Sequence, residues 1–142
     1  MRGNDAKRGL VVWITGLSGS GKTTLASNLI NRLREKNYSN LIFLDGDQLR
    51  EVFGSQNNFD RDSRIRIALL YSRLRGMLAS QGLIVITSTI SMFKEIYAYN
   101  RKNISQYYEV YLRTPIDELK KRDSKKIYSR FASGEISNVA GL

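Results

Sequence analysis

Short apolar runs alternate with longer polar segments along this chain. Four of the runs are rich in β-branched and aromatic residues and are only four to six residues long, which is typical of strands buried in a parallel sheet. They cover residues 10–15, 41–44, 83–87 and 107–112. The pattern therefore predicts four strands.

The segments between these runs favour helices. Apolar residues recur at helical spacing within 23–36 and again within 64–80. The predicted core face of the second helix consists of Ile67, Leu70, Leu74, Met77 and Leu78. A charged helix is expected from about Ile116, after the only proline, with Thr114 as its N-cap. The polar stretch 54–63 predicts a mobile loop.

Strands that alternate with helices at this spacing imply βαβ crossovers. We therefore predict an α/β fold of three layers, in which helices cover both sides of a central parallel sheet. A length of 142 residues, 42% of them hydrophobic, suits one domain over residues 1–142.

Composition limits the chemistry that this chain can perform. Cysteine and histidine are both absent, which leaves carboxylates, lysines and tyrosines for acid–base steps. No apolar run approaches the roughly 20 residues that span a bilayer, and no signal core follows the polar first residues. We expect a cytoplasmic protein that makes no membrane contact.

The formal net charge is +10, from 23 Lys and Arg against 13 Asp and Glu, and it favours anionic partners. The basic residues are dispersed along the chain and no nucleic-acid recognition motif accompanies them. This pattern indicates solvated faces and a cleft for small phosphorylated ligands, and it disfavours a nucleic-acid partner.

A phosphate-binding pattern, G-x-x-x-x-G-K-[ST], lies between the first predicted strand and the first predicted helix, which is the context it requires. Loop N–H groups and the helix N-terminus would face phosphate oxygens. Lys22 would reach the β and γ phosphates, and the Thr23 hydroxyl would ligate Mg²⁺. The alternative is a glycine-rich turn without a ligand. The predicted triphosphate site is Gly16, Leu17, Ser18, Gly19, Ser20, Gly21, Lys22, Thr23 and Thr24.

Two acids and an arginine follow the second predicted strand, in FLDGDQLR. Ligands bind beyond the carboxyl ends of parallel strands, so Asp45 should share a crevice with the glycine-rich loop. Asp45 could accept the proton of an attacking hydroxyl or hold a Mg²⁺-bound water, and Arg50 suits an anionic acceptor. Gly46 would relieve crowding against substrate. The simpler alternative is that Asp47 caps a helix that starts at Gln48. A capping role is less favoured for Asp45.

Five stretches resemble the adenylyl-sulfate kinase family, in order: GLSGSGKTT, LDGDQLR, GLIVITSTIS, EVYLRTPIDELKKRDSKKIY and GEISNVAGL. Members of that family transfer the γ-phosphate of ATP to the 3′-hydroxyl of adenylyl sulfate and form 3′-phosphoadenylyl sulfate. The resemblance implies a P-loop kinase fold with ATP and Mg²⁺ as cofactors and a small-molecule nucleotide as the acceptor. Dimers are common in the family, so the resemblance leaves a homodimer open.

The resemblance also implies roles for individual residues. Asp45 and Lys22 would be catalytic, and Thr23 and Asp45 would serve the metal. Ser91 matches a serine that has been assigned as a phosphoserine intermediate, although direct in-line transfer needs none. The implied acceptor-binding residues are Asp47, Arg50, Phe59, Arg64, Ile90 and Lys125.

Several of these residues also have ordinary structural explanations. Phe59 could be a core residue or a loop anchor, and Ser91 an ordinary loop hydroxyl. Lys125 and Tyr128 lie in a segment that resembles a lid closing over the substrates; the alternative for both is a solvated face.

Departures from the family pattern lie on the acceptor side. Only Arg64 survives from a D-R-x-x-N-I-R-R stretch, where Ile67 replaces the asparagine, while Met92 and Val139 replace a proline and an aromatic residue. Relatives in bacterial capsule pathways phosphorylate a cytidine diphosphate derivative that bears a phosphoramidate, and such losses are a plausible route to that change. The family continues beyond the position of Leu142 into a strand and helix that help to hold adenine, so the resemblance leads us to expect a fragment or a further C-terminal segment.

Three hypotheses remain at this point. The leading one is ATP-dependent phosphorylation of the 3′-hydroxyl of adenylyl sulfate. The second is the same transfer to another nucleotide, such as cytidine diphosphoramidate. The third is a regulatory ATP-binding protein without catalysis, which loss of Asp45 or Lys22 would favour; both residues are present.

Overall fold

A computed structural model describes residues 9–54 and 60–142. Its four strands are β1 (Leu10–Gly16), β2 (Leu41–Asp45), β3 (Ile84–Ser88) and β4 (Tyr107–Leu112). They form one sheet in the order β2-β3-β1-β4, and every neighbouring pair is parallel. The predicted strands are confirmed to within one residue at each end, and so is the parallel sheet.

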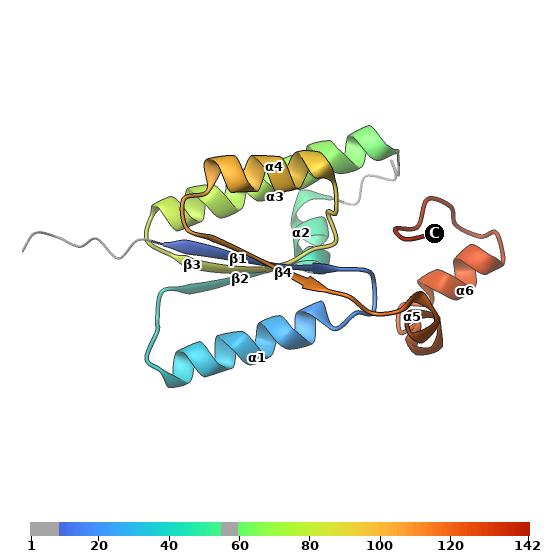
Figure 1. Cartoon of the computed structure of the whole chain (residues 1–142), viewed down its shortest axis with the longest axis horizontal. Coiled ribbons are helices and arrows are strands. Elements are labelled where there is room, and N and C mark those ends of the chain that lie inside the picture. The colour runs from blue at the N-terminus through green and yellow to red at the C-terminus, as the bar shows by residue number, and fades with distance from the viewer. Residues whose placement is uncertain (1–8, 55–59) are drawn as a thin grey trace, which may run out of the picture.

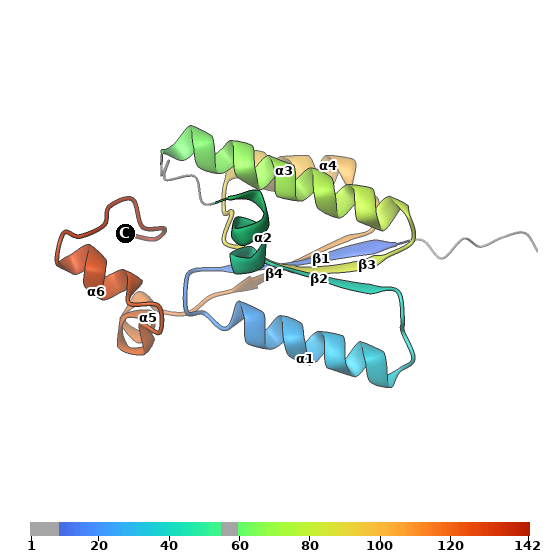
Figure 2. The same ribbon diagram turned by 180° about the vertical axis from the view of Figure 1, so that it is seen from behind.

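Helices cover both faces of the sheet. Helix α1 (Lys22–Glu35) lies on one side, and α3 (Arg61–Ser80) and α4 (Lys94–Asn103) lie on the other (Figures 1 and 2). The short helices α2 (Gly46–Phe53), α5 (Ile116–Arg122) and α6 (Ile127–Ala132) lie at the end of the sheet where the strands terminate (Figure 1). The predicted three-layer α/β arrangement is confirmed.

The core has two halves because successive side chains of a strand point to opposite faces of the sheet. Ile14 and Ile86 pack with Ala26 and Ile30 of α1 on one face. On the other face, Val11 and Val85 pack with α3, and Trp13 packs with Ala68 and Ile96. Burying each large apolar side chain stabilises the fold by roughly 1.5–3 kcal/mol.

The predicted core face of α3 is confirmed only in part: Leu78 packs against the core cluster around Val11 and Val85, and Ile67 and Leu74 are partly buried. Leu70 and Met77 are 48% and 53% exposed, whereas the helix buries Ala68, Tyr71 and Arg75 together with smaller residues. The alanines let the helix approach the sheet closely, and an arginine occupies a position where periodicity predicts a hydrocarbon. Hydrophobic periodicity alone therefore includes Leu70 and Met77, which are exposed, and omits Arg75, which is buried.

Two predictions about helix starts also need correction. Helix α3 begins at Arg61, and the Asp60 carboxylate accepts hydrogen bonds from the backbone N–H (2.9 Å) and the hydroxyl (2.7 Å) of Ser63. The C-terminal part of the predicted loop 54–63 is thus helical, because an aspartate N-cap starts the helix there. The N-cap of α5 is Pro115, without a side-chain bond, so the assignment of Thr114 as cap is wrong.

Helices α4 and α6 are not predicted by the sequence pattern. Helix α4 is polar and buries only Ile96 and Asn100, which gives no clear apolar face. Among the described residues, no helix is both long enough and apolar enough to cross a membrane.

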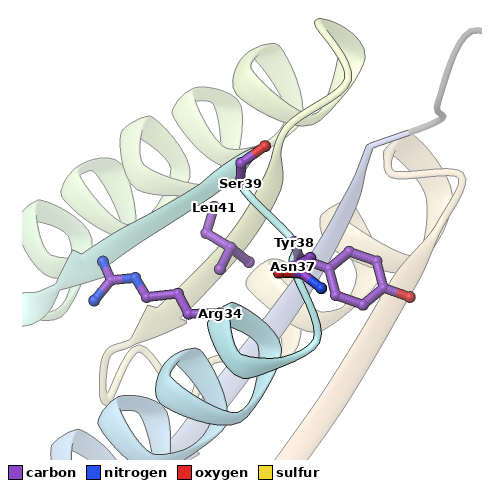
Figure 3. A pocket seen from close by; sticks show the side chains of 5 residues that line it. All are labelled: Arg34, Asn37, Tyr38, Ser39 and Leu41. Atoms are coloured by element: carbon purple, nitrogen blue, oxygen red, sulfur yellow. The ribbon is translucent and has the colours of Figure 1, made fainter.

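A shallow pocket of about 390 Å³ lies at the C-terminal end of α1, where the chain enters β2 (Figure 3). Its lining residues are Arg34, Asn37, Tyr38, Ser39 and Leu41. This pocket is at the opposite end of α1 from the glycine-rich loop (Figure 1), so it is separate from the predicted phosphate site.

Candidate active site

The glycine-rich loop connects the end of β1 to the start of α1. A Cβ atom on Gly16 would lie 2.7 Å from both the Leu112 carbonyl oxygen and the Ser20 Oγ, so only glycine fits there. Gly21 precedes α1 in the left-handed conformation, with φ of 95°. Strand, loop and helix therefore follow one another as the phosphate-binding pattern requires, with Thr23 and Thr24 in the first turn of α1.

Lys22 is the first residue of α1, and its ammonium group lies over the loop. The Nζ atom donates a hydrogen bond to the Leu17 carbonyl at 2.8 Å. Burial, together with the neighbouring charges of Lys125 and Arg50, lowers the pKa of Lys22 from 10.5 to about 8, and the charge of Asp45 opposes this shift. A partly desolvated cation at this position is well placed for phosphate oxygens.

Asp45 ends β2 beside the first turn of α1. Its Oδ1 accepts hydrogen bonds from the Thr23 hydroxyl (3.0 Å) and the Ser88 hydroxyl (2.8 Å), and its Oδ2 accepts one from the Asp47 backbone N–H (3.1 Å). As predicted, Asp45 lies beside the glycine-rich loop, where it contacts the first turn of α1. The carboxylate is fixed by three donors from three different elements.

The same contacts correct the capping assignment. Helix α2 begins at Gly46 and not at Gln48, and Asp45 is its N-cap, with an extended backbone and a side chain bonded to Asp47 N–H. Assigning the cap to Asp47 is therefore wrong. The last residue of the strand is the first that can turn its side chain back onto the open N–H groups of the helix.

Gly46 brings α2 close to β3. A Cβ at this position would lie 3.0 Å from the Ser88 carbonyl oxygen and 3.6 Å from Thr89 Cγ2. These neighbours lie at the end of β3 and directly after it, and the role of Gly46 beside a substrate stays a prediction. This glycine holds the Asp45 turn against the neighbouring strand.

Three predicted acceptor residues lie together at the mouth of the site. Asp47 pairs with Arg50 through Oδ1 and with Lys125 Nζ through Oδ2, the latter at 2.6 Å. All three side chains are about half exposed, so these pairs are weak and can rearrange around an anion. Burial lowers the pKa of Lys125, and Arg50 lowers it further.

The segment from α5 to α6 rests on the glycine-rich loop. The Tyr128 hydroxyl donates to the Ser18 carbonyl at 2.7 Å, and Arg122 Nη1 donates to the Gly19 carbonyl at 3.2 Å. The Asp123 carboxylate accepts from the Tyr128 backbone N–H at 3.0 Å and so orders the start of α6. The segment whose sequence resembles a lid therefore contacts both the glycine-rich loop and, through Lys125, the predicted acceptor residue Asp47.

The remaining predicted residues lie around this centre. Arg64 donates to the Asn138 carbonyl, which joins α3 to the last segment of the chain. Ile90 and Ser91 follow β3; the Thr15 hydroxyl donates to the Ile90 carbonyl, and Ser91 has a positive φ of 35°. Phe59 lies outside the described residues.

Sequence reasoning missed Ser88, the third partner of Asp45. It is paired with Asp45 in the register of β2 and β3 and is the last residue of its strand. The signal was a polar residue after the apolar run LIVIT, at the edge where parallel strands place their ligand-binding residues.

A parallel sheet between helices, with this loop after its first strand and an acid after the next, is the architecture of P-loop kinases. The family model for adenylylsulphate kinase matches residues 8–142, and the chain belongs to that family. The family resemblance in the sequence is therefore confirmed. The chain is an ATP-dependent phosphotransferase by family, and nucleotides are the substrates that suit such a kinase.

Individual relatives differ in their named acceptor. Cytidine diphosphoramidate kinase of Campylobacter jejuni is 48% identical over 93% of this chain and 76% of its own length. The adenylyl-sulfate kinase of Clostridium acetobutylicum is 40% identical over 96% of this chain and 68% of its own length. The structure of Mycobacterium tuberculosis APS kinase CysC, in complex with AMPPNP and APS, is 34% identical with a TM-score of 0.86 and covers 95% of this chain and 80% of that one.

Proposed function

We propose that this chain transfers the γ-phosphate of ATP to the 3′-hydroxyl of cytidine diphosphoramidate. One observation carries the choice of acceptor: identity is 48% to the relative named for that acceptor and 40% to the Clostridium relative named for adenylyl sulfate. The departures at Ile67, Met92 and Val139 support it, since all three lie in stretches that the family resemblance assigns to the acceptor side.

The ATP half of the site is formed by the loop between β1 and α1. Lys22 would turn from the Leu17 carbonyl to the β and γ phosphates and neutralise charge as the phosphoryl group moves. Its desolvation strengthens this attraction, because a charge in a low-dielectric site acts more strongly than one in water.

Thr23 and Asp45 fit a magnesium ion. Their oxygens lie 3.0 Å apart beside the phosphate loop, and a hydroxyl and a carboxylate are the hard oxygen donors that Mg²⁺ takes together with phosphate oxygens and waters. When bound, Mg²⁺ would supply charge neutralisation at the β and γ phosphates.

Asp45 is the base in this proposal. No histidine is present in the chain, and Asp45 is the carboxylate in direct contact with the phosphate-loop residue Thr23. Its fixed position would let it orient the acceptor hydroxyl and take its proton as the bond to phosphorus forms. Ser88 holds the carboxylate in place from the neighbouring strand.

The acceptor would bind between the acid turn and the segment from α5 to α6. Arg50 and Lys125 both reach Asp47 in this structure and could exchange that carboxylate for the anionic groups of a nucleotide. Arg64 and Ile90 would complete the acceptor side. A phosphorylated Ser91 has no part in this proposal, because a hydroxyl placed by Asp45 can attack the γ-phosphate directly.

Adenylyl sulfate is the second candidate acceptor. The family model and the Mycobacterium structure with APS favour it, since that structure shares the fold over 95% of this chain. The two candidates require the same ATP site and the same general base, Asp45. The acceptors themselves differ in their nucleobase and in their anionic group.

The test is a coupled ADP-release assay with ATP, Mg²⁺ and each acceptor in turn. We expect kcat/KM for cytidine diphosphoramidate to exceed that for adenylyl sulfate by at least about tenfold, a difference of about 1.4 kcal/mol in transition-state binding. A reversed ratio would establish the second candidate. Absence of turnover with both acceptors, with ATP binding retained, would refute catalysis on either.

A further inference from the structure

Arg75 is a fully buried cation in the middle of α3. Its side chain is 0% exposed, and among the described residues it forms no ion pair with a carboxylate. Its Nη2 donates to the Thr89 hydroxyl at 3.0 Å, and its guanidinium lies 5.4 Å from the centre of the Trp13 ring. Within the described part of the chain, Nε and Nη1 have no hydrogen-bond partner.

Such a residue is costly for stability. Burial lowers the pKa of Arg75 to about 10, which leaves the guanidinium charged at neutral pH. A buried charge without an anionic partner destabilises a fold, and an apolar side chain of similar volume is often neutral or better in its place. The position therefore points to a role other than stability.

Thr89 is the residue on which Arg75 acts. Its Oγ1 accepts hydrogen bonds from both Arg75 and the Trp13 Nε1 (2.9 Å), and its backbone N–H donates to the Ile14 carbonyl at 3.3 Å. Two donors on one hydroxyl oxygen occupy its lone pairs and fix its rotamer. The residue after β3 is thus held by β1 and α3 together.

Thr89 lies between two parts of the acceptor side. On one flank, Ser88 binds the Asp45 carboxylate, and the Cγ2 of Thr89 lies 3.6 Å from where a Cβ on Gly46 would be. On the other flank come Ile90 and Ser91, whose turn has a positive φ and is tied to β1 through the Ile90 carbonyl. A shift of Thr89 would move both flanks at once.

We infer that Arg75 is a positioning residue for the acceptor: through Thr89 it fixes the end of β3 and the turn 89–91 against the Asp45 turn. The glycine-rich loop and Lys22 belong to a separate connection, β1 to α1, and within the described residues Arg75 forms no hydrogen bond or ion pair with them. The inference rests on the proposed function only in assigning the turn 89–91 to the acceptor side.

The test compares Arg75→Met with Arg73→Met, which removes an exposed cation from the same helix. We expect Arg75→Met to fold with an unchanged or higher melting temperature and to lose about ten- to a hundredfold in kcat/KM for the acceptor, since small displacements far from the chemistry reach that size. KM for ATP should stay within about twofold of wild type. Arg73→Met should match wild type in melting temperature, in kcat/KM for the acceptor and in KM for ATP.

Changes at Thr89 provide an independent measurement. Thr89→Val should reproduce the loss on the acceptor, and Thr89→Ser, which keeps the hydroxyl, should restore most of the activity. The double variant Arg75→Met with Thr89→Val should lose no more than Thr89→Val alone, because both changes break one linkage. If Arg75→Met does not fold, the comparison of Thr89→Val with Thr89→Ser provides the test.

Two results would overturn the inference. Acceptor kinetics within about twofold of wild type in Arg75→Met would remove any positioning role. Equal losses in ATP and acceptor kinetics, with a lower melting temperature, would make Arg75 purely structural. The variants are measured on whichever acceptor the wild-type protein uses best. An error in the proposed acceptor then appears when the wild-type protein is tested on both acceptors. An error about Arg75 appears in the ratio of kcat/KM between variant and wild type.

Discussion

Replacing Asp45 with asparagine separates the structural role of this residue from its proposed chemical role. The Asp45 carboxylate caps α2 through Asp47 N–H and accepts from the hydroxyls of Thr23 and Ser88. Asparagine is as good an N-cap as aspartate, and hydroxyl groups can rotate to suit an amide. We therefore expect Asp45→Asn to change the free energy of unfolding by less than about 1 kcal/mol, or roughly 4 °C in melting temperature.

The effect on turnover should be much larger. An asparagine cannot accept the proton of the acceptor hydroxyl, and general base catalysis contributes about 10²–10⁴-fold, which corresponds to about 3–5.5 kcal/mol. Asp45→Asn should lose kcat by that factor while KM for ATP changes by no more than about threefold, because Lys22 and the loop remain. The expected losses in stability and in activity thus differ severalfold in free energy.

The assay is ADP release at saturating ATP and acceptor, together with a thermal melt of each variant. Asp117→Asn, an exposed acid in the first turn of α5, removes the same charge and should behave as wild type. If Asp45→Asn kept kcat within about threefold of wild type, the assignment of Asp45 as base would be wrong. A large loss in melting temperature would instead identify Asp45 as mainly a cap.

Four further predictions concern the same site. Lys22 has a pKa of about 8 in the folded protein against its usual 10.5, so kcat/KM for ATP should fall as pH rises through 8 and the cation is lost. The contribution of Lys22 to stability should rise between pH 8 and 10.5, because the unfolded chain binds more protons there. Lys125→Met removes a cation that lowers this pKa, so a pH titration of kcat/KM should move to higher pH, unlike Lys121→Met. Ser91→Ala should keep kcat within about threefold of wild type, and a loss above about a hundredfold with trapped phosphoprotein in wild type would contradict direct transfer. Gly46→Ala should reduce acceptor kcat/KM by about tenfold, as its Cβ would press on the Ser88 carbonyl; unchanged kinetics would show that the turn tolerates the shift.

Much of the candidate ATP site could be located from the sequence because its signals are local. The glycine-rich loop, Lys22 and Thr23 are contiguous, and the strand before them is a plain apolar run. Asp45 could be placed at the same edge because a parallel sheet aligns the carboxyl ends of its strands. These inferences need only the fold class and the order of the elements.

Features that depend on tertiary contact could not be predicted. The hydrogen bond between Ser88 and Asp45 depends on strand register, and the hydrogen bond between Tyr128 and Ser18 joins residues far apart in sequence. Arg75 opposes the hydrophobic pattern outright: periodicity assigns arginine to solvent, whereas the fold buries it and exposes Met77. Capping by Asp45 in place of Asp47 depended on where a helix begins, which is the least certain feature of any sequence-based assignment.

The most direct test of the proposed function is a competition between the two acceptors. Purified protein is given ATP, Mg²⁺ and equal concentrations of cytidine diphosphoramidate and adenylyl sulfate, and ³¹P NMR follows which nucleotide gains a phosphate and at which hydroxyl. We predict a new 3′-phosphate on the cytidine compound while most of the adenylyl sulfate remains. Preferential phosphorylation of adenylyl sulfate, or a phosphate at another position of the cytidine compound, would contradict the proposal.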